Sequence, residues 1–106
     1  MVRDELIEAA ENSFGERLVR KRNKSMESFY LDDMKKGRGF FWVDFKKSGN
    51  KGFRVHIQKI KRVCDDIHER GYGRYPLIFL NSASQIPEII QKLEYIVSHF
   101  NDRYIE

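Results

Sequence analysis

Residues 39–58 read GFFWVDFKKSGNKGFRVHIQ, and this stretch decides the fold. Two runs rich in aromatic and β-branched residues flank the polar segment SGNKG at positions 48–52. Such runs are typical of β-strands, and glycine with asparagine allows the tight turn that joins two antiparallel strands. The stretch therefore predicts a β-hairpin, with strands over residues 39–47 and 52–58.

Strands and helices are also predicted on both sides of this hairpin. The further elements are two strands and three helices: strands over residues 25–31 and 75–80, and helices over residues 4–14, 59–70 and 82–100. Residues 16–22 fit either a helix or a strand, and the pattern leaves that choice open. The predicted order is α-β-β-β-α-β-α, an α+β fold in which helices pack on one face of an antiparallel meander sheet.

Size and composition indicate one domain, residues 1–106, of which 41% are hydrophobic and 34% charged. An internal disulfide needs two cysteines, and the chain has only Cys64, so hydrophobic burial must stabilise the fold. This cysteine usage is typical of a reducing compartment. No apolar run approaches the roughly 18 residues of a spanning helix, and the N-terminus lacks a signal peptide's apolar segment. We expect a cytoplasmic protein without membrane association. The sequence does not determine its oligomeric state.

Basic residues are concentrated in the middle of the chain. The formal net charge is +4, from 20 Lys and Arg against 16 Asp and Glu. Between Arg17 and Arg62 there are 15 basic and 4 acidic residues, and the rest of the chain is acidic. A block of one sign attracts polyanions or an acidic protein surface. The alternative is a solvated surface that only keeps the protein soluble.

Strand alternation predicts which side chains share each face of the sheet. One face is expected to be core, with Phe41, Val43 and Phe45 on the second predicted strand. The other face is expected to mix rings and cations: Tyr30, Phe40, Trp42, Lys46, Arg54 and His56. Bases stack on aromatic rings and Lys and Arg neutralise phosphates, so such a face suits single-stranded nucleic acid. Two alternatives stay open, a second small core under covering loops and a ligand pocket.

The function predicted from these patterns is a non-catalytic module that binds nucleic acid or another polyanion. Its predicted binding residues are the cations and rings of the central segment: Arg20, Lys21, Arg22, Lys24, Tyr30, Trp42, Lys46, Lys51, Arg54, His56, Lys59, Lys61 and Arg62. We expect no metal and no cofactor, because the histidines lack metal-ligand spacing and no Gly-rich phosphate loop occurs. The alternative from another class is a protein-interaction or regulatory, inhibitor-like module that binds an acidic protein surface.

Residues 22–106 resemble small bacterial α+β domains of unknown function, of MmcQ/YjbR-like shape, found at the C-terminus of predicted transport and restriction-associated proteins. The motifs behind this resemblance are FYL at 29–31, FFWV at 40–43, GFRVHI at 52–57 and the Gly71 to Gly73 turn. Residues 82–90 fit that family's last helix start loosely. The resemblance implies the fold, and it implies nucleic-acid binding only as far as that has been suggested for the shape.

A second resemblance is to the PD-(D/E)xK nucleases, whose core runs α-β-β-β-α-β. It rests on the acid-x-Lys triplet at 44–46 after a hydrophobic strand and on the acid pair at 32–33. The resemblance implies a divalent metal bound by acids, with a lysine assisting the attacking water. The residues concerned are Asp32 or Asp33, Asp44, Lys46 as the assisting base, and Glu5 or Glu8 as a further ligand. No proline precedes the first acid and the interval between the acids is short, so this is the minority hypothesis.

Residues 4–70 also resemble a double-stranded-RNA-binding domain, whose cationic helix start contacts phosphates. The stretch Lys59-Ile60-Lys61-Arg62 offers cations at a similar place. The family's alanine is missing, and the chain continues with an extra strand and helix, which counts against membership.

Overall fold

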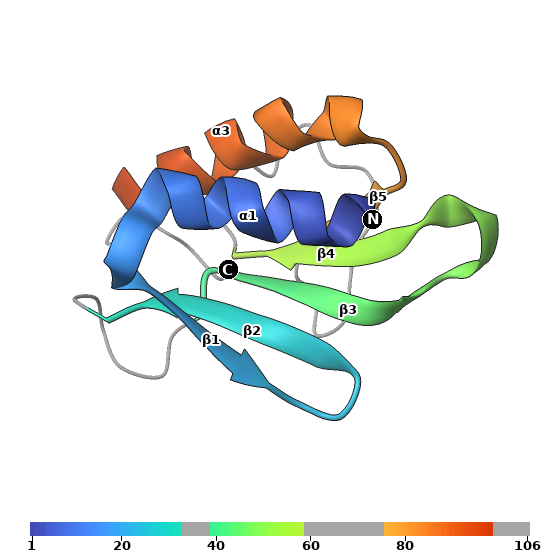
Figure 1. Cartoon of the computed structure of the whole chain (residues 1–106), viewed down its shortest axis with the longest axis horizontal. Helices are drawn as coiled ribbons and strands as arrows, with labels where there is room; N and C mark the ends of the chain where they lie inside the picture. Colours follow the sequence, from blue (N-terminus) through green and yellow to red (C-terminus); the bar gives the residue numbers. More distant parts are fainter. Residues whose placement is uncertain (33–38, 59–75, 99–106) are drawn as a thin grey trace.

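A computed structural model describes residues 1–32, 39–58 and 76–98 of the chain (Figure 1). These residues form an α+β fold with two α-helices and a five-stranded antiparallel sheet. The elements are α1 (Val2–Phe14), β1 (Leu18–Arg22), β2 (Met26–Leu31), β3 (Phe41–Lys47), β4 (Phe53–Ile57), β5 (Leu77–Leu80) and α3 (Ile86–Ser98). The strands lie in the order β1-β2-β3-β4-β5 and each is antiparallel to its neighbour, which confirms the predicted meander.

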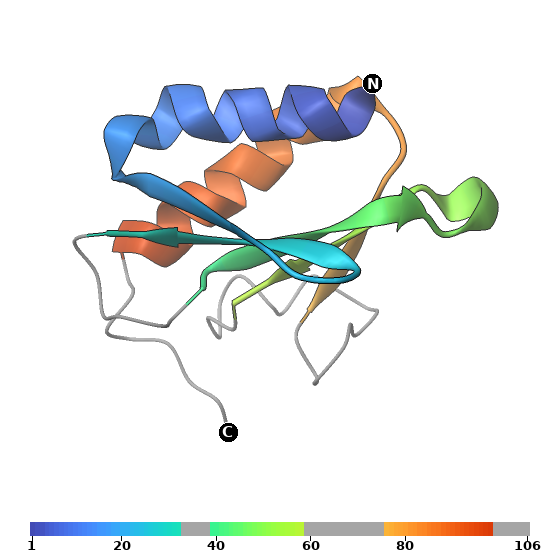
Figure 2. The same ribbon diagram turned by 60° about the horizontal axis from the view of Figure 1, so that its bottom comes forward.

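Both helices cover the same face of the sheet, as Figure 2 shows. The core lies between the two layers. Its fully buried side chains include Leu6 and Ala10 from α1, Leu93 and Ile96 from α3, and Phe29, Phe41, Val43, Val55 and Ile57 from the sheet. The sheet residues in this set alternate along their strands, so strand periodicity decides which face receives the helices.

The segment that the sequence left open forms a strand. Helix α1 ends at Phe14, and Gly15 follows with φ 63°, a left-handed conformation that favours glycine. A 3₁₀ turn over Gly15–Arg17 then leads into β1, which pairs with β2. The structure therefore adds a strand to the predicted order at this position. The predicted helix over residues 59–70, with Cys64, lies outside the described residues.

The predicted start of the last helix is confirmed. The backbone N–H groups of Asn81 and Ser82 donate to Gln85 Oε1, at 2.8 and 3.0 Å, and Ser84 N–H donates to Ser82 Oγ at 3.3 Å. These bonds form a capping box, which satisfies donors that the first turn of a helix leaves unpaired. A 3₁₀ turn over Ala83–Gln85 continues into α3.

The prediction for Phe40 was wrong. Alternation placed its side chain on the outer face with Trp42, but the ring is fully buried in the core. It packs edge-to-face on Phe14, 5.3 Å between centroids, and on Phe41 at 5.0 Å. The physical reason is that the backbone bends at Phe40 before β3 begins at Phe41, so strand alternation does not extend to it.

We expect Phe40→Ala to lower the free energy of unfolding by about 3–5 kcal/mol, because it removes a fully buried ring and leaves a cavity. Urea denaturation measures this loss. Tyr30→Ala is the matched variant, since Tyr30 is only half-buried and lies on the sheet face opposite the helices. A loss for Phe40→Ala no larger than that for Tyr30→Ala would contradict the core position of Phe40.

Candidate functional site

Two hairpin ends lie at the same end of the sheet. Strands β1 and β2 are joined over residues 23–25, and β3 and β4 over residues 48–52. Because β2 and β3 are antiparallel, with Met26 opposite Asp44, the start of β2 lies beside the second half of β3, and the second hairpin extends beyond the first. The two hairpin ends project on the same side of the sheet in both ribbon views (Figures 1 and 2).

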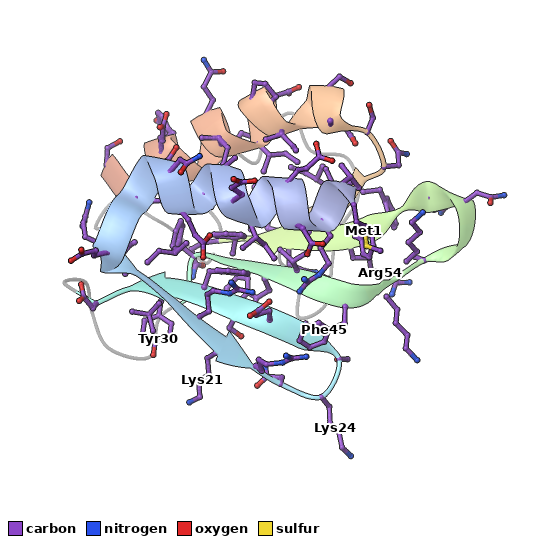
Figure 3. The ribbon with its side chains drawn as sticks, viewed as in Figure 1. Met1, Lys21, Lys24, Tyr30, Phe45 and Arg54 are labelled. Atoms are coloured by element: carbon purple, nitrogen blue, oxygen red, sulfur yellow. The ribbon has the colours of Figure 1, made fainter. Side chains whose placement is uncertain are left out.

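Exposed cations gather at these hairpin ends. We call them the basic edge: Lys21, Arg22 and Lys24 from the first hairpin, and Lys46, Lys47 and Lys51 from the second. Within residues 1–32, 39–58 and 76–98, none of these side chains forms an ion pair with a carboxylate. Figure 3 shows Lys21 and Lys24 pointing away from the body of the protein. Among the described residues, no carboxylate therefore neutralises these charges.

A buried carboxylate lies behind the basic edge, on the side of the helices. Glu27 in β2 accepts from Arg3 Nη2 of α1 at 3.0 Å, and from Arg20 Nε and Nη2 of β1 at 2.9 and 3.2 Å. Arg3 Nε also donates to the Asp44 carbonyl oxygen at 2.8 Å. Arg20 Nη1 donates in addition to Glu11 Oε2 at 3.4 Å. This Glu27 network joins α1, β1, β2 and β3, and it pairs Arg20, an exposed residue that was predicted to bind, with the carboxylates of Glu27 and Glu11.

The charges of the Glu27 network support one another. Burial raises the pKa of the Glu27 carboxyl, but the hydrogen bonds and charges of Arg20 and Arg3 outweigh it, so that pKa lies below its ordinary value. The hydrogen bond with Glu27 in turn raises the pKa of the Arg20 guanidinium above its ordinary value. Both groups therefore stay ionised at neutral pH. Sequence analysis missed this network, although an acid on the core face of a strand was a signal that it needs a buried cationic partner.

The aromatic rings at this end of the sheet are in contact with cations. Phe45, which was predicted to be core, is only half-buried. The guanidinium carbons of Arg3 and Arg22 lie 4.9 and 4.6 Å from its ring centroid. Two lysines of the second hairpin make similar contacts: Lys47 Nζ lies 6.0 Å from the Phe53 ring and Lys51 Nζ lies 5.1 Å from the Phe79 ring. Such cation–π contacts orient the cationic side chains along the edge.

The face opposite the helices carries the predicted ring and cation residues Tyr30, Trp42 and Arg54. Tyr30 and Trp42 are half-buried, and Arg54 is exposed. The Trp42 ring covers Gly39, because a Cβ atom at position 39 would lie 2.8 Å from Trp42 Cζ2. This close approach requires glycine at position 39. One part of the Trp42 ring, which was predicted to stack on bases, is therefore covered by the backbone of Gly39.

The prediction that His56 lies on an accessible face was wrong, because its side chain is buried. It stands between Trp42 and Leu77 in the strand register. Its Nε2 lies 3.4 Å from Asp44 Oδ1, and Arg54 Nη1 lies 3.6 Å from Asp44 Oδ2. Burial lowers the pKa of His56, the Asp44 carboxylate opposes this, and Arg54 adds to the lowering. His56 is therefore neutral at pH 7, and its Nδ1 has no hydrogen-bond partner among the described residues.

The register does not bring together the acids of the nuclease hypothesis. Asp44 lies opposite Met26 at the start of β2, whereas Asp32 follows the end of β2. At roughly 3.3 Å per residue, this separation is about 20 Å along the strand. A metal ion needs ligand oxygens at roughly 2–2.5 Å, so one ion does not bridge these two acids. The described part of the chain holds no group of three or more His, Cys, Asp or Glu placed to bind a metal ion.

Several predicted residues have no described position. Asp33, Lys59, Lys61 and Arg62 lie outside the described residues. Glu5 and Glu8, the further acids of the nuclease hypothesis, are exposed on α1. No helix within residues 1–32, 39–58 and 76–98 is long and apolar enough to cross a membrane.

Comparison with protein-family models, with curated proteins and with solved structures gives no match for this chain. The resemblances to MmcQ/YjbR-like domains, to nucleases and to double-stranded-RNA-binding domains therefore stay predictions.

We expect Glu27→Gln to lower the free energy of unfolding by about 3–5 kcal/mol, because it leaves the buried Arg3 guanidinium without a counter-charge. Glu11→Gln is the matched control, since Glu11 is exposed and its loss should cost less than about 1 kcal/mol. The native pKa of Glu27 lies below the ordinary value of 4.5, so its contribution is complete above that pH and is lost as pH falls through the native pKa. Urea titrations at several pH values should show this loss of unfolding free energy at acid pH in the wild type and not in Glu27→Gln. Equal losses in the two variants at neutral pH would contradict the role of Glu27.

A second pH effect is expected from His56. Its native pKa is lowered below 6.5, so the unfolded chain binds a proton that the native protein does not as pH falls through 6.5. The wild type should therefore lose stability between pH 7 and pH 5. His56→Gln, which is neutral at both pH values, should lose less over the same interval. Urea denaturation at both pH values measures the difference, and identical losses would show that His56 does not titrate in this way.

Proposed function

We propose that the protein is a non-catalytic nucleic-acid-binding module and that the basic edge is its contact surface. The observation that carries this proposal is that exposed cations of two hairpins meet at one end of the sheet without carboxylate partners among the described residues. Lysine and arginine side chains that neutralise phosphates release condensed counterions, and this release favours binding.

The Glu27 network supports the proposal because it holds the two hairpins in fixed positions. Arg3 connects the side chain of Glu27 in the first hairpin with the backbone of Asp44 in the second. Arg20 fastens β1 to β2 within the first hairpin. Cations on a fixed scaffold lose less conformational freedom on binding than cations on a flexible tail. Within the network, Glu27 and Glu11 are paired with Arg3 and Arg20. These two carboxylates therefore do not neutralise the cations of the basic edge.

The acidic charge of the helices favours one orientation of an approaching polyanion. The exposed acids of α1 and α3 include Asp4, Glu5, Glu8, Glu88 and Glu94. A polyanion is repelled by this layer and attracted by the basic edge, so the field of the protein orients the encounter. The acidic helices and the basic edge together favour one docking orientation.

The same cations could instead take an acidic protein surface, as in an interaction or inhibitor-like module. Direct titration with nucleic acid distinguishes a nucleic-acid partner from an acidic protein partner. A duplex or a single strand of about 20 nucleotides presents phosphates without any protein. Absence of binding to both at 50 mM salt would contradict the proposal and favour the protein partner.

We expect the paired charge reversal Lys24→Glu with Lys51→Glu to weaken nucleic-acid binding strongly, because it removes one cation from each hairpin end. Arg17→Glu is the matched control, a charge reversal at an exposed residue just before β1, at the other end of that strand. Fluorescence anisotropy with labelled oligonucleotides at 50 and 200 mM salt provides the measurement. Wild-type affinity should fall roughly 10³-fold over this range, as expected for about six phosphate contacts, and the double variant should show a shallower slope. Equal weakening by Arg17→Glu would contradict a localised site.

A further inference from the structure

We infer that the basic edge continues onto the sheet face opposite the helices and that single-stranded nucleic acid binds there, with a phosphate at Lys21 and bases on Tyr30 and Trp42. This inference rests on the proposed function and names its substrate class. The sequence placed the two rings on this face. The pairing of β1 with β2 adds Lys21 to the same face, which the sequence left undecided.

One row of side chains runs from the basic edge to the middle of this face. The strand register places Lys21 of β1 opposite Ser28 of β2, and Ser28 opposite Trp42 of β3. Residues that are directly opposite in a sheet share one face. Arg20, the residue before Lys21, contacts Glu27 on the helix side, so Lys21 points away from the helices. Two strand spacings, about 10 Å, separate Lys21 from Trp42.

Tyr30 lies in the next row of the same face. It stands opposite Val19, which is two residues before Lys21, and it is two residues after Ser28. Tyr30 is therefore the diagonal neighbour of both Lys21 and Trp42, at about 7–8 Å from each. Figure 3 shows Lys21 between Tyr30 and Lys24 along the first hairpin. One cation of the basic edge and two rings thus lie within reach of a few successive nucleotides.

This part of the face is accessible, whereas the part over β4 and β5 is buried. Along the row from β1 to β5, Lys21 is exposed, Trp42 is half-buried, and His56 and Leu77 are buried. Tyr30, in the next row, is half-buried as well. A single strand that reaches the sheet from the basic edge therefore meets the two rings first.

The Trp42 ring lies against the backbone of Gly39. A Cβ atom at position 39 would come within 2.8 Å of Trp42 Cζ2, so this side of the ring is occupied by the protein itself. The Trp42 side chain is nevertheless only half-buried. A ring that is supported before binding loses little conformational freedom when a base stacks on it.

The acids of this face define where the bound strand runs. Asp44, two residues after Trp42, has Arg54 Nη1 at 3.6 Å from its Oδ2, so its charge is balanced by a cation. Asp32 is exposed two residues after Tyr30, on the side away from the basic edge. This carboxylate repels phosphates. The favourable surface therefore extends from the basic edge as far as the two rings.

The two rings distinguish a single strand from a duplex. The bases of a single strand are unstacked and available to aromatic side chains, whereas those of a duplex are enclosed in the double helix. A duplex thus contacts the basic edge through its phosphates alone. A single strand adds stacking, and each stacked ring increases affinity about fivefold or more.

The test compares single strands of DNA and RNA with the corresponding duplexes of equal length, by fluorescence anisotropy at 200 mM salt. At this concentration salt weakens the phosphate contacts, whereas stacking is not a charge interaction. We expect the better-bound single strand to bind at least about fivefold more tightly than either duplex. The same strand should quench the emission of Trp42, the only tryptophan of the chain, and the duplexes should not.

Tyr30→Ala should weaken single-strand binding about fivefold or more and leave duplex affinity within about twofold of wild type. Duplex affinity also reports that the variant is folded. Tyr30→Phe is the matched control, because it keeps the ring and should keep single-strand affinity within about twofold of wild type.

Three results would overturn this inference and leave the proposed function standing. They are equal or tighter binding of duplexes at 200 mM salt, absence of Trp42 quenching by single strands, and equal effects of Tyr30→Ala on both probes. A loss for Tyr30→Phe as large as that for Tyr30→Ala would also overturn it, because the contact would then depend on the hydroxyl group and not on stacking. Absence of binding to every probe at 50 mM salt would overturn the proposed function itself.

Discussion

The Glu27 carboxylate is the constraint on which the arrangement of the charged end of the molecule depends. It is buried between α1 and the sheet, and two arginines from different elements donate to it. A buried carboxylate without such partners would be strongly destabilising, so helix, first hairpin and third strand have to meet around it. The consequence is that two separate hairpins present their cations at one end of the sheet.

Much of the fold could be predicted from residue periodicity. Residues 39–58 carry the pattern of two strands and residues 82–100 that of a helix, and the structure confirms the meander and the last helix. Strand β1 was undecided because its charged residues carry little apolar periodicity, and it owes its position to pairing with β2. Phe40 was misplaced because a backbone bend before β3 interrupts the alternation.

The candidate site was less predictable than the fold. A sequence shows that cations are abundant but not which of them are neutralised. Arg20 and Lys21 are neighbours in sequence, yet Arg20 is held by Glu27 and Glu11 while Lys21 points to solvent. The choice follows from the face of β1 on which each side chain lies, and that face is known only once β1 is paired with β2.

The central claim is that the two hairpin ends together contact nucleic acid, and amide chemical shifts measured by NMR during titration with a short duplex test it most directly. The largest shifts should fall on residues 21–25 and 46–51, with the surfaces of α1 and α3 unchanged. Shifts confined to the helices, or centred on Tyr30 and Trp42 with the hairpin ends unaffected, would contradict it.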